Sequence, residues 1–303
     1  MIYPQQLFKI ALDELVEEIG ADARIIAAVL LGSMSHDVVW EKSDIDLLLI
    51  TVDDKIKQSG MSLLKRDIIV HAQLMTRAEF RKAAASALQS SFMHSYLSRG
   101  RVLFTRDPTI TSFFDQPDTM GARDRQIRLL ECAVCILPSL TKAQKWLIVK
   151  QDYRYAFFYV TKMIDRLATL EVVHANGNPG REVVQQALAI NPVFFNQVYT
   201  DLIDRPLEME TVGAAIDSIE RYLLDRVAPL FGPLLDYLSA ANSARSATEI
   251  DHYFANQMNI ECVSLACEWL SDHNIVQRVG LSRRLTDKSR VDVEEAAFYY
   301  SAT

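Results

Sequence analysis

The chain has 303 residues, half of them hydrophobic and 9% aromatic, a composition typical of a globular protein with two or three domains and not of a disordered chain. A formal net charge of −7 excludes a protein that binds nucleic acid over its whole surface, so any such contact must be a local patch. No apolar run approaches the ~20 residues of a membrane span, and the N-terminus lacks the apolar core of a signal peptide.

The first predicted elements alternate between helix and strand. Pro4 suits the first position of a helix whose apolar residues recur every four positions until Gly20. A continuous apolar strand is expected over residues 25–31, then a short helix up to Trp40, and a second strand over residues 44–52. The polar residues 53–66 are expected to form a loop or a short irregular helix.

The turn after the first strand and the start of the second carry the chemistry. Gly32 permits close approach of the backbone to a ligand, and Ser33 adds a hydroxyl and a backbone N–H, which suits a phosphate. Asp44 and Asp46 are separated by one residue, so on a strand their side chains share one face. Two such carboxylates, completed by water and substrate phosphates, are typical of a Mg²⁺ site.

A third strand is expected over residues 67–75, with alternating faces. One face is apolar, and the other carries Asp67, His71 and Gln73, which we expect to lie toward the metal site. His71 could act as a general base near neutral pH, or it could be structural. Asp67 could serve as a further carboxylate, or it could be a solvated charge at a strand end.

Together, a hydrophobic residue, Gly32-Ser33, a spacer and Asp44-x-Asp46 between two apolar strands resemble the signature of the DNA polymerase β-type nucleotidyltransferase superfamily. The resemblance implies Mg²⁺ or Mn²⁺ on the two carboxylates and an NTP, with ATP as the expected one, as substrate. It also implies a third carboxylate on the following strand. The middle of that strand offers His71 and Gln73 instead, which is the main departure from the family pattern.

The first domain is expected to end near residue 115. Thr76 and Glu79 form a capping box that starts a helix running toward Arg99, and residues 101–104 read as a strand that closes the sheet. The polar segment 115–121, which contains a proline and a glycine, is the predicted domain boundary.

Helical periodicity dominates from residue 122 to about residue 238 and predicts an antiparallel bundle. Helices are expected near 122–137, 141–174, 181–189, 193–203 and 208–228, with breaks at Pro138, residues 176–180, Asn191-Pro192 and Arg205-Pro206. Lys150 and Arg154 lie four residues apart, so on a helix they share a face and could contact a triphosphate; a solvated helix face is the alternative.

The C-terminal segment 245–303 resembles a winged helix-turn-helix domain. A capping box at Ser246 and Glu249 opens a helix, a second helix spans 261–273, and a hairpin turning at Gly280 is expected before a last helix from about Val291. Residues 278–290 carry five cations and one acid, which could bind nucleic acid; a wing used only for packing or dimer contacts is the alternative.

The sequence therefore predicts an α+β chain with a nucleotidyltransferase domain (1–115), a helical, substrate-binding-like domain (121–240) and a winged-helix-like domain (245–303). This order resembles bacterial nucleotidyltransferase-like proteins. We expect transfer of a nucleoside monophosphate from an NTP to an unidentified hydroxyl acceptor; the alternative is an inactive nucleotide- or DNA-binding regulator. Four cysteines without a zinc-ligand pattern indicate a reducing cytoplasm, and a homodimer is left open.

Overall fold

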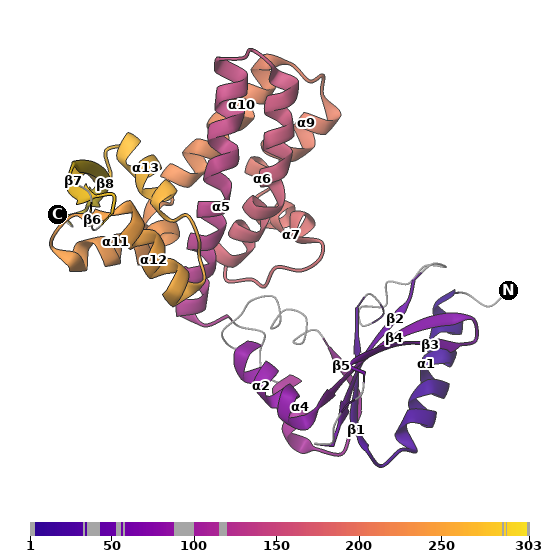
Figure 1. The fold of residues 1–303 in the computed structure, drawn as a ribbon. Helices are drawn as coiled ribbons and strands as arrows, with labels where there is room; N and C mark the ends of the chain where they lie inside the picture. Colours follow the sequence, from indigo (N-terminus) through magenta and orange to yellow (C-terminus); the bar gives the residue numbers. More distant parts are fainter. Residues whose placement is uncertain are drawn as a thin grey trace. The chain divides into compact units, whose positions relative to one another are not determined.

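A computed structural model describes residues 4–32, 34, 43–52, 56, 58–87, 100–114, 120–286, 288 and 290–301. The chain divides into two compact units, Met1–Met120 and Gly121–Thr303. The first is a mixed sheet flanked by helices and the second is largely helical, which confirms the α+β class (Figure 1). The second unit contains both the predicted bundle and the predicted winged helix; a division near residue 240 stays a prediction.

The sheet of the first unit has five strands in the order β3-β4-β2-β1-β5. Strands β2 and β4 are parallel, and the other neighbours are antiparallel. The strands are β1 (Ile25–Leu31), β2 (Ile45–Thr51), β3 (Gly60–Lys65), β4 (Ile68–Thr76) and β5 (Arg101–Thr105). Strands β2 and β4 therefore lie side by side within the sheet. Strand β2 follows Gly32 in the chain, and β4 follows the segment expected to be a loop.

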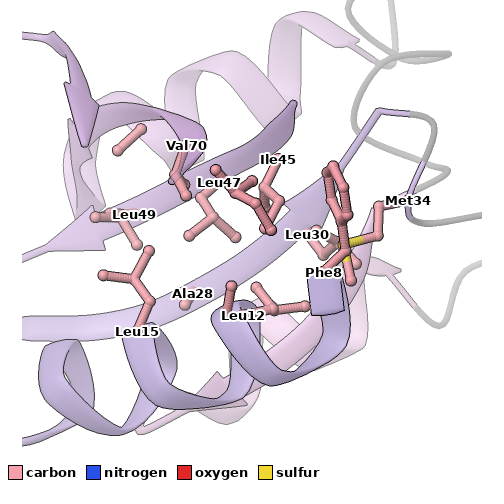
Figure 2. Packing of buried hydrophobic residues seen from close by; sticks show 13 residues of the cluster. Phe8, Leu12, Leu15, Ala28, Leu30, Met34, Ile45, Leu47, Leu49 and Val70 are labelled. Atoms are coloured by element: carbon pink, nitrogen blue, oxygen red, sulfur yellow. The ribbon is translucent and has the colours of Figure 1, made fainter. Parts of the chain in front are cut away.

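One face of this sheet is covered by α1 (Pro4–Gly20), whose bounds are those predicted. Figure 2 shows Phe8, Leu12 and Leu15 of this helix packed against apolar side chains of β1, β2 and β4. In β2 the residues that join this core are Ile45, Leu47 and Leu49, so Asp46 between them lies on the opposite face.

The opposite face carries a second core, which lies under α2 (Arg77–Ala87) and α4 (Pro108–Phe114). Phe80 and Ile110 of these helices pack with Leu48 and Ile50 of β2. The predicted capping box at Thr76 is present, because the Thr76 hydroxyl accepts from the Glu79 backbone N–H at 3.1 Å. The expected helix up to Trp40 and the end of the helix toward Arg99 lie outside the described residues.

The segment expected as a loop contains a strand, which corrects that prediction. Strand β3 pairs with β4 through a two-residue turn, Arg66-Asp67, in which both residues have positive φ, 48° and 63°. Such a turn matches the twist of a hairpin, but it usually has Asn-Gly or Asp-Gly at these positions. The unusual pair Arg-Asp concealed the hairpin in the sequence.

The second unit opens with two long helices, α5 (Ala122–Ile148) and α6 (Tyr153–His174). The predicted break at Pro138 is wrong, because α5 continues through Pro138, which lies on an exposed part of the helix surface. The single helix expected over 141–174 is also wrong. Gln151 has φ 53°, and the Asp152 side chain caps α6 by accepting from the Tyr155 N–H.

The remaining elements of the second unit follow in chain order. They are α7 (Val183–Ile190), α8 (Pro192–Phe195), the π-helix η2 (Asn196–Thr200), α9 (Asp201–Asp204), α10 (Met209–Leu224), α11 (Val227–Ala241), β6 (Arg245–Ser246), α12 (Ala247–Met258), α13 (Ser264–Asp272), β7 (Gln277–Arg284) and β8 (Asp292–Tyr299). None of the described helices is both long enough and apolar enough to cross a bilayer.

The C-terminal hairpin differs from its prediction in two ways. Gly280 is not the turn, because it pairs with Ala296 in the middle of β7 and β8. The expected last helix from Val291 is instead strand β8, which also pairs with β6. Alternation of burial along β8 fits a half-exposed strand, and Gly280 leaves room for the Glu294 side chain, which a Cβ would approach to 2.9 Å.

Candidate functional site

The site is built around Asp46, which lies where β1 ends and β2 begins. Leu31, the last residue of β1, pairs with Asp46 across the antiparallel ladder. Gly32 follows with φ +70°, and a Cβ on Gly32 would lie 2.1 Å from Asp46 Oδ2. Only glycine fits this contact, because any side chain would collide with the carboxylate and would also strain the backbone. The Gly32 of the sequence motif therefore shapes the surroundings of Asp46 directly.

His71 is the neighbour of Asp46 on the other side. The parallel pairing of β2 and β4 sets Asp46 opposite His71, and both side chains lie on the face away from α1. His71 Nε2 is 3.2 Å from Asp44 Oδ2, with both side chains about half exposed. The structure thus brings together three of the predicted site residues, Asp44, Asp46 and His71.

Ser62 on β3 completes a chain of polar contacts through His71. Ser62 Oγ lies 3.2 Å from His71 Nδ1, and Ser62 faces His71 across the β3–β4 ladder. A carboxylate can only accept, so the tautomer with its proton on Nε2 is the one that suits the contact with Asp44. In the neutral imidazole, Nδ1 is then the acceptor for the Ser62 hydroxyl. This arrangement can hold a hydroxyl group at a basic nitrogen.

Asp46, Ser62 and His71 border an open hollow of about 510 Å³. Its lining includes Asp46, Gly60, Ser62, His71 and Gln73. A volume of this size falls in the range of roughly 300–1,000 Å³ that small-molecule sites occupy. The polar face of β4 therefore lines a cavity large enough for a nucleotide-sized ligand.

The donor set is compatible with a divalent cation of the Mg²⁺ type. Mg²⁺ is commonly bound by one or two protein carboxylates and takes its other ligands from water and phosphates. Asp44 and Asp46 can supply those two carboxylates, and the backbone of Gly32 lies against the second. In the part of the chain that the structure describes, no group of three or more His, Cys, Asp or Glu side chains could hold a metal ion.

Asp67 is separated from this cluster. It lies in the turn between β3 and β4, four residues before His71, or roughly 13 Å along a strand that rises about 3.3 Å per residue. Its neighbour Arg66 binds Glu14 of α1, with Nε to the two carboxylate oxygens at 3.0 and 2.9 Å. This position fits the alternative that Asp67 is a solvated charge at a strand end.

The other predicted site residues lie elsewhere. Ser33 is outside the described residues. Lys150 and Arg154 belong to the second unit, where both are exposed. Lys150 lies two residues after the end of α5, and Arg154 lies in the first turn of α6. Their predicted contact with a triphosphate stays a prediction.

Ser62 is the site residue that the sequence did not reveal. It lies in the segment expected as a loop, and a lone serine between Met61 and Leu63 gives no chemical signal. The alternation of β3 could have shown that Ser62 shares a face with Gly60, but only once its pairing with β4 is known.

Comparisons with known proteins agree with this geometry. Residues 14–109 match the family model described as Polymerase beta, Nucleotidyltransferase. The whole chain resembles the crystal structure of a nucleotidyltransferase-like protein from Exiguobacterium sibiricum 255-15, with a TM-score of 0.62, 16% sequence identity, and coverage of 97% of this chain and 100% of that chain. No curated protein sequence matches the chain. Residues 14–109 therefore form a nucleotidyltransferase domain of the polymerase β type, which implies a nucleotide substrate.

Proposed function

We propose that the first unit transfers a nucleoside monophosphate from an NTP, with ATP as the expected one, to a hydroxyl acceptor and releases pyrophosphate. The observation that carries this proposal is Asp46 in contact with Gly32 and beside His71 in an open hollow. The nucleotidyltransferase family match over residues 14–109 supports the same class of reaction.

Asp44 and Asp46 would hold Mg²⁺ or Mn²⁺ together with the triphosphate. When bound, such an ion stabilises the negative charge that develops on the phosphate oxygens during displacement at phosphorus. The backbone at Gly32 permits close approach of the phosphates, because it has no side chain. The resemblance to the superfamily adds Ser33 as a further phosphate contact.

His71, and not Asp67, is the group we assign to the acceptor. The acceptor hydroxyl displaces the Ser62 hydroxyl from His71 Nδ1 and attacks the α-phosphorus, its proton passes to Nδ1, and the bond between the α-phosphorus and the pyrophosphate oxygen breaks. Asp44 lies 3.2 Å from the other ring nitrogen and would stabilise the imidazolium that forms. The Ser62 hydroxyl at 3.2 Å marks the place where Nδ1 can hold such a group.

The test is pyrophosphate release from NTPs in the presence of Mg²⁺, with nucleotide binding measured by calorimetry. Asp46→Asn should abolish release and weaken metal-dependent binding, whereas Asp13→Asn, at an exposed site on α1, should leave both unchanged. His71→Gln should lower turnover by roughly 10²–10⁴-fold with binding retained, the usual contribution of a general base. Turnover equal to the wild type in Asp46→Asn would contradict the proposal.

The presence of His71 also favours a second candidate function, that of an inactive nucleotide-binding regulator. Where the superfamily has a third carboxylate, this strand carries a histidine beside Asp46. An inactive nucleotide-binding regulator would show metal-dependent nucleotide binding that Asp46→Asn weakens, and no pyrophosphate release with any hydroxyl acceptor. The binding and release measurements above therefore separate the two functions.

A further inference from the structure

A ladder of aromatic rings lies across α5 and α6 in the second unit. Trp146 of α5 contacts Tyr155 of α6 with ring centroids 4.3 Å apart, and Tyr155 contacts both Phe158 and Tyr159 at 5.5 and 5.6 Å. Tyr155 and Phe158 are each 42% exposed. We call these four rings the aromatic surface. Rings at positions i, i+3 and i+4 of a helix share one face, so the surface presents several neighbouring π-faces.

Cations surround this surface. Lys162 Nζ lies 4.6 Å from the Phe158 ring centroid, and Lys142 Nζ lies 5.8 Å from that of Tyr159. Residues 138–162 contain five cations and one acid, Asp152, which is the cap of α6. The five cations are Lys142, Lys145, Lys150, Arg154 and Lys162, and all are exposed. This stretch is strongly basic in a chain whose net charge is −7.

These cations differ from those of the predicted wing. On the wing, Arg278 pairs with Asp272 at 2.6 Å, Arg283 pairs with Glu295, and Arg284 Nε is 3.4 Å from Asp292. Within the described ranges, no comparable ion pair joins an acid to any of the five cations beside the aromatic surface. Their charge is therefore more available to an external anion than the charge of the paired wing arginines.

Exposed rings and cations together favour one kind of partner. In a two-fold contact between two copies of this chain, the same patch would meet itself, and lysines would face lysines. A single nucleic-acid strand offers the complement, because its phosphates are anionic and its unpaired bases stack on aromatic side chains. A duplex offers the phosphates but hides the faces of its bases.

We propose that the aromatic surface binds single-stranded nucleic acid. Bases stack on Tyr155 and Phe158, while Lys142, Lys162 and Arg154 contact the phosphates. The aromatic surface belongs to the second unit and the hollow around Asp46 to the first, and the proposal does not depend on nucleotidyl transfer. It is also a different location from residues 278–290, where the sequence suggested nucleic-acid binding.

The experiment is fluorescence anisotropy with the full chain and a labelled single-stranded oligonucleotide of about twelve nucleotides, a length within the range of about 4–16 that one such site covers. We expect binding at low salt that weakens as salt rises. Tyr155→Ala with Phe158→Ala should reduce affinity by roughly tenfold or more, the usual loss when stacking rings are removed. Lys142→Gln with Lys162→Gln should flatten the salt dependence.

The matched control is Tyr253→Ala on α12. Tyr253 is also exposed, at 38%, and stacks on Tyr237 at 4.3 Å, but it is flanked by Glu249 and Asp251. The Tyr253→Ala variant should bind the oligonucleotide with the affinity of the wild type. The double variant Arg283→Ala with Arg284→Ala on the wing should do the same. Three results would overturn the proposal: no binding at low salt, equal binding of the same sequence as a duplex, or unchanged affinity in the Tyr155 and Phe158 double variant.

Discussion

At the scale of single residues, the contact between Gly32 and Asp46 is the tightest constraint on the site. Gly32→Ala places a Cβ 2.1 Å from the carboxylate and puts alanine at φ +70°, so the turn and Asp46 must both shift. We expect loss of nucleotide-dependent pyrophosphate release together with destabilisation by roughly 1–2 kcal/mol, the usual cost of a left-handed residue. Release assays and urea unfolding measure the two effects.

Gly60→Ala is the matched control for that substitution. Gly60 lines the same hollow, but a Cβ there meets nothing within 4 Å. This variant should keep its turnover and its unfolding midpoint close to those of the wild type. If Gly32→Ala also behaves as the wild type does, the contact with Asp46 has no functional role.

At the scale of elements, the position of Asp67 in the turn of the β3–β4 hairpin allows a test of whether it acts in catalysis or only as a residue of the turn. Asp67→Gly removes the carboxylate and places glycine at φ 63°, where it is favoured over other residues. Because His71 and not Asp67 is near the acceptor position, we expect unchanged turnover and a gain in stability of up to about 1 kcal/mol. Steady-state kinetics and thermal unfolding test both. A large fall in turnover without unfolding would return Asp67 to the site.

Glu295 connects strand β8 to the start of α12 and gives this region a dependence on pH. Its carboxylate accepts from the Thr248 N–H at 3.1 Å and pairs with Arg283. Partial burial opposes ionisation, but the hydrogen bonds from Thr248 and Arg283 outweigh it and lower the pKa of Glu295 from 4.5 to about 2. The charged form therefore stabilises the fold above pH 4.5, and this contribution is lost as the pH falls toward 2.

Glu295→Gln tests this effect. At neutral pH the variant should be less stable by about 1–2 kcal/mol, because bonds to a charged acceptor are lost. As the pH falls from 4.5 toward 2, the free energy of unfolding of the wild type should decrease more steeply than that of the variant. Urea unfolding at neutral and acidic pH measures the difference, and the exposed neighbour Glu294→Gln should retain the wild-type slope. Parallel slopes for Glu295→Gln and the wild type would contradict the assignment.

The same elements show what a sequence can reveal. Helix α1, strands β1 and β2, and the caps at Thr76 and Ser246 follow from local periodicity and local hydrogen bonds, and the structure confirms them. The pairing of Asp46 with His71 depends on the register of β2 against β4, which no local pattern encodes. Ser62 was missed because its strand is closed by an uncommon turn. The helix break predicted at Pro138 is wrong because a proline can be accommodated on the exposed face of a long helix.

At the scale of the whole molecule, the two units have separate hydrophobic cores. Leu30 of β1 and Leu167 of α6 are both fully buried, one in each unit. Chains with several domains often unfold in more than one step. We therefore expect calorimetry to resolve two transitions, one for each unit.

Truncation of a buried leucine assigns those transitions. Leu30→Ala should destabilise the first unit and Leu167→Ala the second, each by about 2–5 kcal/mol. Because distant sites without shared partners act additively, the double variant should show both losses, within roughly 0.5 kcal/mol of their sum. A chain in which Leu30→Ala lowers both transitions equally would be a single cooperative unit. In that case substitutions on the aromatic surface would also be expected to affect the stability of the hollow around Asp46, and every binding variant would need its unfolding measured.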